Sequence, residues 1–252
     1  MTVARRYFVR FSIAVGVVFL LIVANLPWEE SRGSARNSQC RYNLKAIGRA
    51  LQQYHDEWGS FPPAYVNDEQ GRRTYGWRTL LLPYLDQAAM YHFYRFDEPW
   101  NSAHNAKLCS EIRPRSMPFI CPEQDGDQTT YLAVVGPKTA WPGTRPAKRE
   151  VDFPDGLRST ILVVEVENSG VQWMEPRDLL FDEMSFEING AAGNAISSRH
   201  KFGGFWPWSG PTSTVNVLFA DGSISRLPAD TAPDTIRAWI TASGGDKAPR
   251  PP

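Results

Sequence analysis

Residues 40–58, CRYNLKAIGRALQQYHDEW, carry the strongest helical pattern of this 252-residue chain. Apolar side chains recur there at spacings of three and four. They are Cys40, Leu44, Ile47, Leu51, Tyr54 and Trp58. This spacing predicts an amphipathic helix with one apolar face. Gly59 and Pro62-Pro63 follow, so the helix is expected to end near Trp58. We therefore expect a globular domain to pack on that face.

An apolar run precedes this helix. Residues 11–26 carry no charged side chain, and with residues 7–10 they reach about 20 residues, the length of a membrane-spanning helix. Three arginines precede the run and two glutamates follow it, which predicts a cytoplasmic N-terminus. A cleaved signal peptide has a similar basic start, but Ile22-Val23-Ala24 is a poor cleavage site. A buried core helix is the other alternative.

We interpret residues 7–26 as a signal anchor within an N-terminal segment, residues 1–30. The protein is then expected to cross the bacterial inner (cytoplasmic) membrane once. Residues 31–245 are expected to form an extracytoplasmic domain, and residues 246–252 a disordered tail.

The rest of the chain shows helical patterns first and strand patterns later. Residues 77–94 predict a helix with a start or bend at Pro83. Asp221-Gly222 predicts a two-residue hairpin turn. Residues 231–241 predict a short final helix. Strands are expected at 130–135, 159–165, 215–219 and 223–227. This order predicts an α+β fold with an antiparallel sheet.

Composition and motifs exclude several functions. The 27 basic residues balance 27 acidic ones, which weighs against binding nucleic acid through its phosphates. The four histidines show no H-E-x-x-H spacing, and the sequence has no G-x-S-x-G elbow, P-loop or G-x-G-x-x-G. We expect no enzymatic activity and no cofactor.

Calcium is a candidate ligand. Asp125, Asp127 and Asp155 stand beside glycines in predicted turns, and hard cations prefer such oxygen ligands. Ordinary Asp-Gly turns explain the same residues. Glu165, at the end of an apolar run, is either a buried carboxylate with a partner or the point where the strand reaches solvent.

Three cysteines leave one over after any pairing. Cys109 and Cys121 are candidates for a disulfide that closes an irregular loop. Cys40 offers an alternative partner, and three reduced thiols are the remaining possibility.

The densest aromatic patch lies at residues 202–208, FGGFWPW. Phe205, Trp206 and Trp208 could form a surface for a glycan, another small ligand or a partner, together with Trp141 or Trp173. The same residues could instead fold back over the core.

The segment SQCRYNLKAIGRALQQYHDEWGSFPPA, residues 38–64, resembles the signature of the bacterial family known as domain of unknown function 1559. The resemblance continues in order through YGWRTLLLPYLDQ, EPWNSAHN, FICPEQ, TTYLAVVG, DGLRSTILVVEV, VQWMEPRDL, VNVLFADGSISRL and ITASGGD. The proteins of this family are pseudopilin-like and are numerous in planctomycete-type bacteria.

The resemblance implies a type IV pilin-like fold. Its long N-terminal helix lies half in the membrane and packs on an antiparallel sheet with long loops. It also implies a structural or interaction role in the cell envelope, or in a type II secretion or type IV pilus-like system. Other pseudopilin-like or envelope proteins are the expected partners. The alternative function is an extracytoplasmic module that binds a glycan or another small ligand through the aromatic loop.

The chain departs from the family pattern at two places. Its N-terminus lacks the glycine of the prepilin cleavage motif and the glutamate in the apolar run, which favours an unprocessed anchor. The family's H-x9-DG motif matches His200, Asp221 and Gly222, but twenty residues separate the histidine from the aspartate. We expect a structural hairpin role for this motif. An enzyme would require His200, Asp221 and Glu165 to converge.

Overall fold

The computed structural model describes residues 13, 15–17, 28–111, 117–121, 126–190, 194–198, 201–202 and 212–245. The chain divides into two compact units, Met1–Ala35 and Arg36–Pro252, and each is described by itself. In the first unit, residues 15–17 are helical. Among the described residues, no helix is both long and apolar enough to cross a membrane. Most of the predicted span, 7–26, and the tail, 246–252, lie outside the described residues.

The longest element is α2 (Trp28–Trp58), a helix of 31 residues. The predicted apolar face is confirmed for its first four members, which are fully buried: Cys40, Leu44, Ile47 and Leu51. Trp58 was expected on the same face, but it is 63% exposed. It is the last residue of α2, and its ring stacks on the half-buried Tyr54 with 6.1 Å between the ring centroids. The apolar face of α2 is therefore exposed to solvent at its last residue, Trp58.

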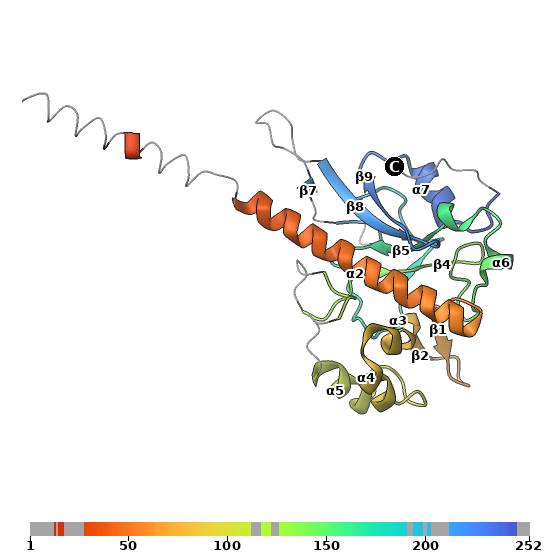
Figure 1. Ribbon diagram of the computed structural model, residues 1–252. Helices are drawn as coiled ribbons and strands as arrows, with labels where there is room; N and C mark the ends of the chain where they lie inside the picture. The colour runs from red at the N-terminus through yellow and green to blue at the C-terminus, as the bar shows by residue number, and fades with distance from the viewer. Residues whose placement is uncertain are drawn as a thin grey trace, which may run out of the picture. The chain divides into compact units, whose positions relative to one another are not determined.

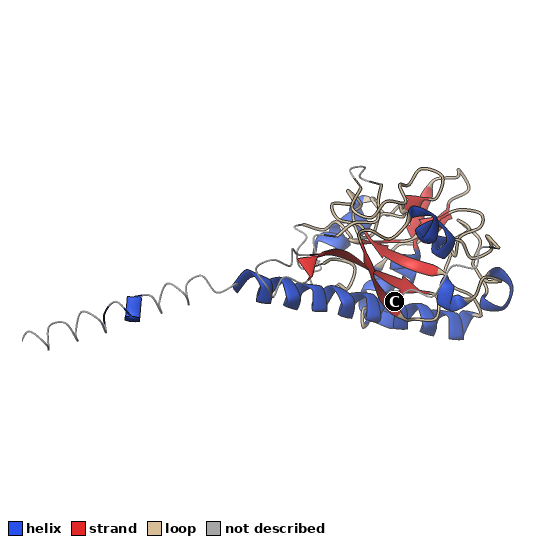
Figure 2. Ribbon diagram, turned by 90° about the horizontal axis from the view of Figure 1, so that it is seen from above, coloured by secondary structure: helices blue, strands red, loops and turns tan. Residues whose placement is uncertain are grey.

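The main sheet contains β3, β5, β7, β8 and β9, all paired antiparallel, and α2 runs along one side of it (Figures 1 and 2). The strands are β1 (Tyr65–Asn67), β2 (Arg73–Gly76), β3 (Tyr131–Leu132), β4 (Val134–Val135), β5 (Ile161–Glu165), β6 (Leu179–Leu180), β7 (Lys201–Phe202), β8 (Thr212–Phe219) and β9 (Ile224–Pro228). Strands β1 and β2 form an antiparallel pair, while β4 and β6 form a parallel one. The fold is therefore α+β, and its main sheet is antiparallel as predicted.

Close packing joins α2 to the sheet. A Cβ atom at Gly48 would lie 2.9 Å from Leu218 Cδ1, so glycine is needed there for the present approach of helix and strand. The Gln52 side chain donates a 3.1 Å hydrogen bond to the Ala220 carbonyl, just after β8. These contacts fix the register of the helix on β8.

The sheet is buried on both faces. All five residues of β5 are buried. Leu162 and Leu218 belong to the core on the α2 side, whereas Val164 and Phe219 belong to a second core. Helix α7 (Pro233–Ile240) covers this second core with Ile236, Trp239 and Ile240. Because both faces are covered, β5 reads as a continuous apolar run and not as an alternating one.

The segment 77–94 forms three short helices where one bent helix was expected. Pro83 lies at the start of the second, and Asp86 ends it in a left-handed conformation with φ of 59°. The short helices are α3 (Trp77–Leu80), η1 (Leu82–Leu85), α4 (Ala88–Phe93), α5 (Ala103–Glu111), α6 (Arg149–Asp152) and η3 (Leu157–Ser159).

The expected Cys109–Cys121 disulfide is wrong. Cys121 is bonded to Cys40, with 5.4 Å between the Cα atoms, and Cys109 is a buried free thiol. The packing explains this pairing. Asn43, one turn after Cys40 in α2, donates a hydrogen bond to the carbonyl of Ile120 and so holds the loop against the helix. The bond therefore ties α2 to the loop before β3.

Candidate functional site

The Asp221-Gly222 pair forms the predicted turn between β8 and β9. The Asp221 carboxylate accepts hydrogen bonds from the N–H and the hydroxyl of Ser223, and Arg158 lies 3.5 Å from its other oxygen. Gly222 has φ of +85°, which an L side chain rarely adopts. These side-chain contacts of Asp221 stabilise the turn and balance its charge, and its backbone N–H donates a 3.2 Å hydrogen bond to the Leu157 carbonyl. His200 lies outside the described residues.

Glu165 is a buried carboxylate with partners. The Asn216 backbone N–H donates a 2.8 Å hydrogen bond to it, and the Asn216 side chain bridges Glu165 and Asn37 of α2. This network joins α2, β5 and β8. Because Glu165 lies beside Asn216 and Asp221 follows the far end of β8, the fold does not bring these two carboxylates together.

Asp155 and Asp127 are the calcium candidates that the structure describes. The Asp155 carboxylate accepts hydrogen bonds from the N–H groups of Gly244 and Gly245. Asp127 is exposed in a turn, and Asp125 lies outside the described residues. Within the described part of the chain, no three His, Cys, Asp or Glu side chains lie close enough to hold a metal ion.

The expected aromatic surface is only partly described. Phe205, Trp206 and Trp208 lie outside the described residues, so binding through this loop stays a prediction. Trp141 and Trp173, which were expected to extend the surface, are almost completely buried. The indole N–H of Trp141 donates a 2.7 Å hydrogen bond to the Leu162 carbonyl inside the core. Neither tryptophan is available to a ligand at the surface.

A buried ion pair joins two of the sequence segments that carry the family resemblance. Arg78, from YGWRTLLLPYLDQ, and Asp178, from VQWMEPRDL, lie 2.7 Å apart with side chains 3% and 1% exposed. Asp178 also accepts hydrogen bonds from the Ala133 N–H and the Trp77 indole. Burial raises the pKa of Asp178, while the Arg78 charge and these donors oppose the rise. The cluster holds the fold together without an exposed reactive atom.

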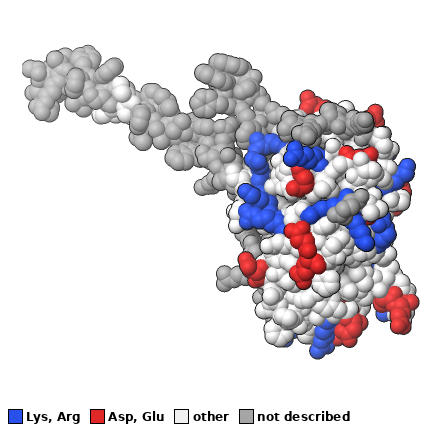
Figure 3. Space-filling model, turned by 45° about the vertical axis from the view of Figure 1, so that its right-hand side comes forward, with Lys and Arg blue, Asp and Glu red and all other residues white. Residues whose placement is uncertain are grey.

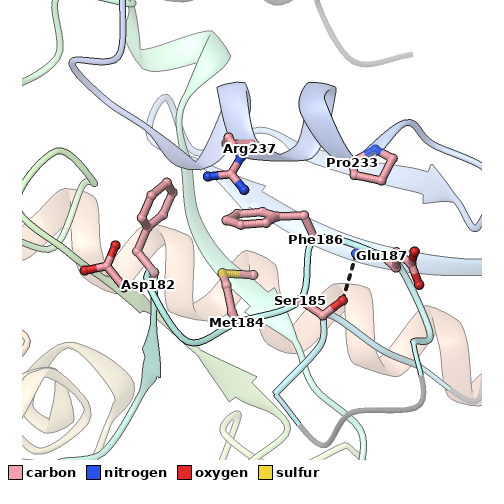
Figure 4. Close-up of a pocket in the computed structure, with 8 residues that line it drawn as sticks. Asp182, Met184, Ser185, Phe186, Glu187, Pro233 and Arg237 are labelled. Atoms are coloured by element: carbon pink, nitrogen blue, oxygen red, sulfur yellow. Dashed lines mark hydrogen bonds between the residues drawn. The ribbon is translucent and has the colours of Figure 1, made fainter.

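An open pocket at the surface has a different character (Figure 4). Its volume is about 420 Å³, and we call it the arginine pocket. It is lined by Phe181, Asp182, Met184, Ser185, Phe186, Glu187, Pro233 and Arg237. The guanidinium carbon of Arg237 lies 4.1 Å from the centre of the Phe186 ring and 5.7 Å from that of Phe181. Such stacking fixes a charged group on an apolar surface.

A second cavity, of about 330 Å³, adjoins the first and shares Phe181 and Asp182 with it. Its other lining residues include Tyr65, Pro142 and Leu180. The second cavity combines these apolar residues with the carboxylates of Asp182 and Glu183.

No sequence motif indicates this site. Phe181 and Phe186 lie in an irregular segment after β6, and Arg237 lies on the exposed side of α7. The fold alone brings these three residues together. On the face in Figure 3, basic and acidic side chains lie side by side and form no broad field of one sign.

One family model matches residues 29–150, and its description is protein of unknown function (DUF1559). The match runs from the start of α2 into α6, and the arginine pocket lies beyond it. Searches of curated proteins and of solved structures found no match. The match over residues 29–150 supports the resemblance of the chain to the DUF1559 family.

Proposed function

We propose that the protein is a membrane-anchored, pseudopilin-like component of the cell envelope with a structural or interaction role. The observation that carries the proposal is α2, whose apolar face packs along an antiparallel sheet. This is the arrangement expected of a pilin-like subunit. Basic and acidic side chains are balanced, and the motif residues Arg78 and Asp178 are buried. Both features support a structural role over a catalytic one.

The disulfide supports export of the domain. Structural disulfides persist in oxidising compartments and are rare in the bacterial cytoplasm. The Cys40–Cys121 bond spans a sequence separation of 81 residues and lies in the core beside α2. A bond that closes a loop of this size stabilises a fold by about 4.5 kcal/mol in the chain-entropy model. An extracytoplasmic location would allow the domain to form it.

The N-terminal sequence supports the anchor. Residues 11–26 are free of charge, and the basic residues before them favour a cytoplasmic N-terminus. A single span would fix the domain at the outer side of the inner membrane. Its role would then be to present its surfaces to other envelope proteins.

Fractionation and protease access test this proposal on the full-length chain expressed in a Gram-negative bacterium. We expect the protein to stay with membranes after alkaline carbonate washing. Proteinase K added to spheroplasts should digest the domain, while a cytoplasmic marker stays intact. A double variant, Val18→Asp with Leu21→Asp, interrupts the apolar run and should move the protein to the soluble fraction. Recovery of the unaltered full-length chain in the cytoplasm would refute the anchor.

Interaction is tested by crosslinking in membranes. A photo-crosslinking amino acid at Lys45, on the exposed side of α2, should give discrete adducts with envelope proteins or with a second copy. The same amino acid at the buried position Leu44 serves as the control and should give none. An absence of adducts from several exposed positions would contradict an interaction role.

A further inference from the structure

Arg237 carries a positive charge without a polar partner in the described part of the chain. Its guanidinium makes no hydrogen bond and no ion pair there, and its observed contacts are with the rings of Phe181 and Phe186. By contrast, Arg78 and Arg177 each bind a carboxylate. Stacking uses the flat face of a guanidinium and leaves its N–H donors, which lie in the plane, free for a ligand.

The fold holds each part of this arrangement in place. Helix α7 is fixed to the sheet by its buried residues, among them Trp239, whose ring packs edge-on against Phe219. The Phe181 N–H donates a 2.9 Å hydrogen bond to the Val135 carbonyl. A Cβ atom at Gly136 would lie 2.8 Å from Phe181 Cβ, so the glycine makes room for the ring. The site is therefore built before any ligand arrives.

The charges around the pocket restrict what it can hold. Asp182 and Glu187 lie on opposite sides of the pocket, and their carboxylates point away from the guanidinium (Figure 4). They would repel a ligand with several negative charges, such as a polyphosphate. Arg237 would in turn repel a cation. The charges of the pocket therefore favour a ligand with a single negative charge, placed at the guanidinium.

The apolar surface defines the rest of the ligand. Met184 lies beneath Phe186 and is buried, and the two phenylalanine rings pack edge to face with 5.3 Å between their centroids. The pocket volume of about 420 Å³ falls within the usual range for small ligands. The adjoining cavity offers further apolar surface at Leu180, which is 37% exposed.

We propose that the arginine pocket binds a single carboxylate carried on an apolar group, with Arg237 as the bidentate donor. The carboxylate lies in the plane of the guanidinium, and the apolar group contacts Met184 and the phenylalanine rings. A free organic acid and an acidic side chain beside apolar residues in a partner protein share this chemistry. The site is independent of the proposed envelope role.

Titration of the full-length protein in nanodiscs tests the proposal, with binding followed by ligand-detected NMR. The free-acid probe is 3-phenylpropionate, and 3-phenylpropanol is its neutral match. The peptide probe is acetyl-Leu-Glu-Leu-amide, and acetyl-Leu-Gln-Leu-amide is its neutral match. We expect each carboxylate to bind about tenfold or more tightly than its neutral match, because a charge-assisted bidentate pair is lost in the neutral probe.

Variants assign the binding to the pocket. Arg237→Gln should lower the affinity for both acids about tenfold or more, and Arg237→Lys should retain only part of it. Arg49→Gln removes an exposed charge from α2 and should change nothing. Equal thermal midpoints of the variants and the parent protein would show that the fold is intact.

The outcomes separate the two sources of the carboxylate. Tighter binding of the peptide than of the free acid would support a partner protein that also uses the adjoining cavity. Binding of the free acid alone would support a small-molecule ligand. Equal binding of acids and neutral matches, tighter binding of inorganic phosphate, or unchanged binding by Arg237→Gln would each overturn the proposal.

Discussion

The Arg78 guanidinium donates a 2.7 Å hydrogen bond to the Asp178 carboxylate inside the protein, although 100 residues separate the two in sequence. Arg78 also donates to the carbonyl groups of Trp173, Tyr131, Glu175 and Arg177. The pair thus joins α3 to the segments around β3 and before β6. A buried guanidinium tolerates this position because its donors find acceptors on several sides.

Asp178→Asn should destabilise the protein by about 3–5 kcal/mol. The substitution keeps the size of the side chain but leaves the Arg78 charge buried without a counter-charge. Urea unfolding of the purified full-length protein, followed by tryptophan fluorescence, measures the change in free energy. Glu98→Gln removes one partner of the exposed Arg95 pair and should leave the midpoint almost unchanged. Equal midpoints for both variants would contradict the role of the buried pair.

The thiols should show one free cysteine per folded chain. Under denaturing, non-reducing conditions an alkylating reagent should modify Cys109 alone, and after reduction all three cysteines. In the native protein Cys109 should react slowly at pH 8, because burial raises its pKa to about 11. Mass spectrometry of peptides checks both results. A Cys109–Cys121 linked peptide would show that the pairing is wrong.

Removal of the disulfide should cost about 2–5 kcal/mol, the usual range for a native bond. Cys121→Ser is the test variant, and the urea midpoint is the measurement. Cys109→Ser is the matched control, since it replaces a buried thiol outside the bond. A loss no larger than that of the control would argue against a stabilising role for the disulfide.

Gly48→Val should destabilise the packing of α2 on β8 by about 1–3 kcal/mol. A Cβ atom at this position would lie 2.9 Å from Leu218 Cδ1, and valine would add two methyl groups to it. Gly48→Ala should cost less, because the gain of about 1 kcal/mol in helix propensity offsets the shift of Leu218. Lys45→Val places the same side chain on the exposed side of α2 as a control. Equal losses at both positions would contradict this packing.

The sequence was informative at two places where local chemistry determines the structure. The spacing of Leu44, Ile47 and Leu51 predicted the buried face of α2, and Asp221-Gly222 predicted the β8–β9 turn. Both signals act over a few residues. The Cys40–Cys121 bond, by contrast, depends on which loop reaches α2, and spacing along the chain carries no such information.

The candidate site was invisible for the same reason. Phe181, Phe186 and Arg237 form one pocket only because α7 and the segment after β6 lie on the same side of the sheet. No short motif links them. Composition also does not show which aromatic residues are exposed. Trp141 and Trp173 were expected at the surface with the aromatic loop, but the fold buries both.

Alkaline pH should destabilise the protein through Tyr54. Burial, and then the neighbouring Tyr84, raise the pKa of Tyr54 to about 12, while the phenol of an unfolded chain has a pKa of about 10. The fold therefore favours the neutral phenol. Its contribution to stability is complete below about pH 10 and is lost as the pH rises towards 12.

Urea midpoints at pH 9 and pH 11 measure this effect, in a Cys109→Ser background that prevents thiol exchange with the disulfide. The midpoint should fall between the two pH values, and the fall should be smaller for Tyr54→Phe, which cannot lose a phenolic proton. Tyr42→Phe removes an exposed hydroxyl from the same helix and should leave the fall unchanged. If Tyr54→Phe and Tyr42→Phe lose stability equally over this range, burial of Tyr54 does not link its proton to folding.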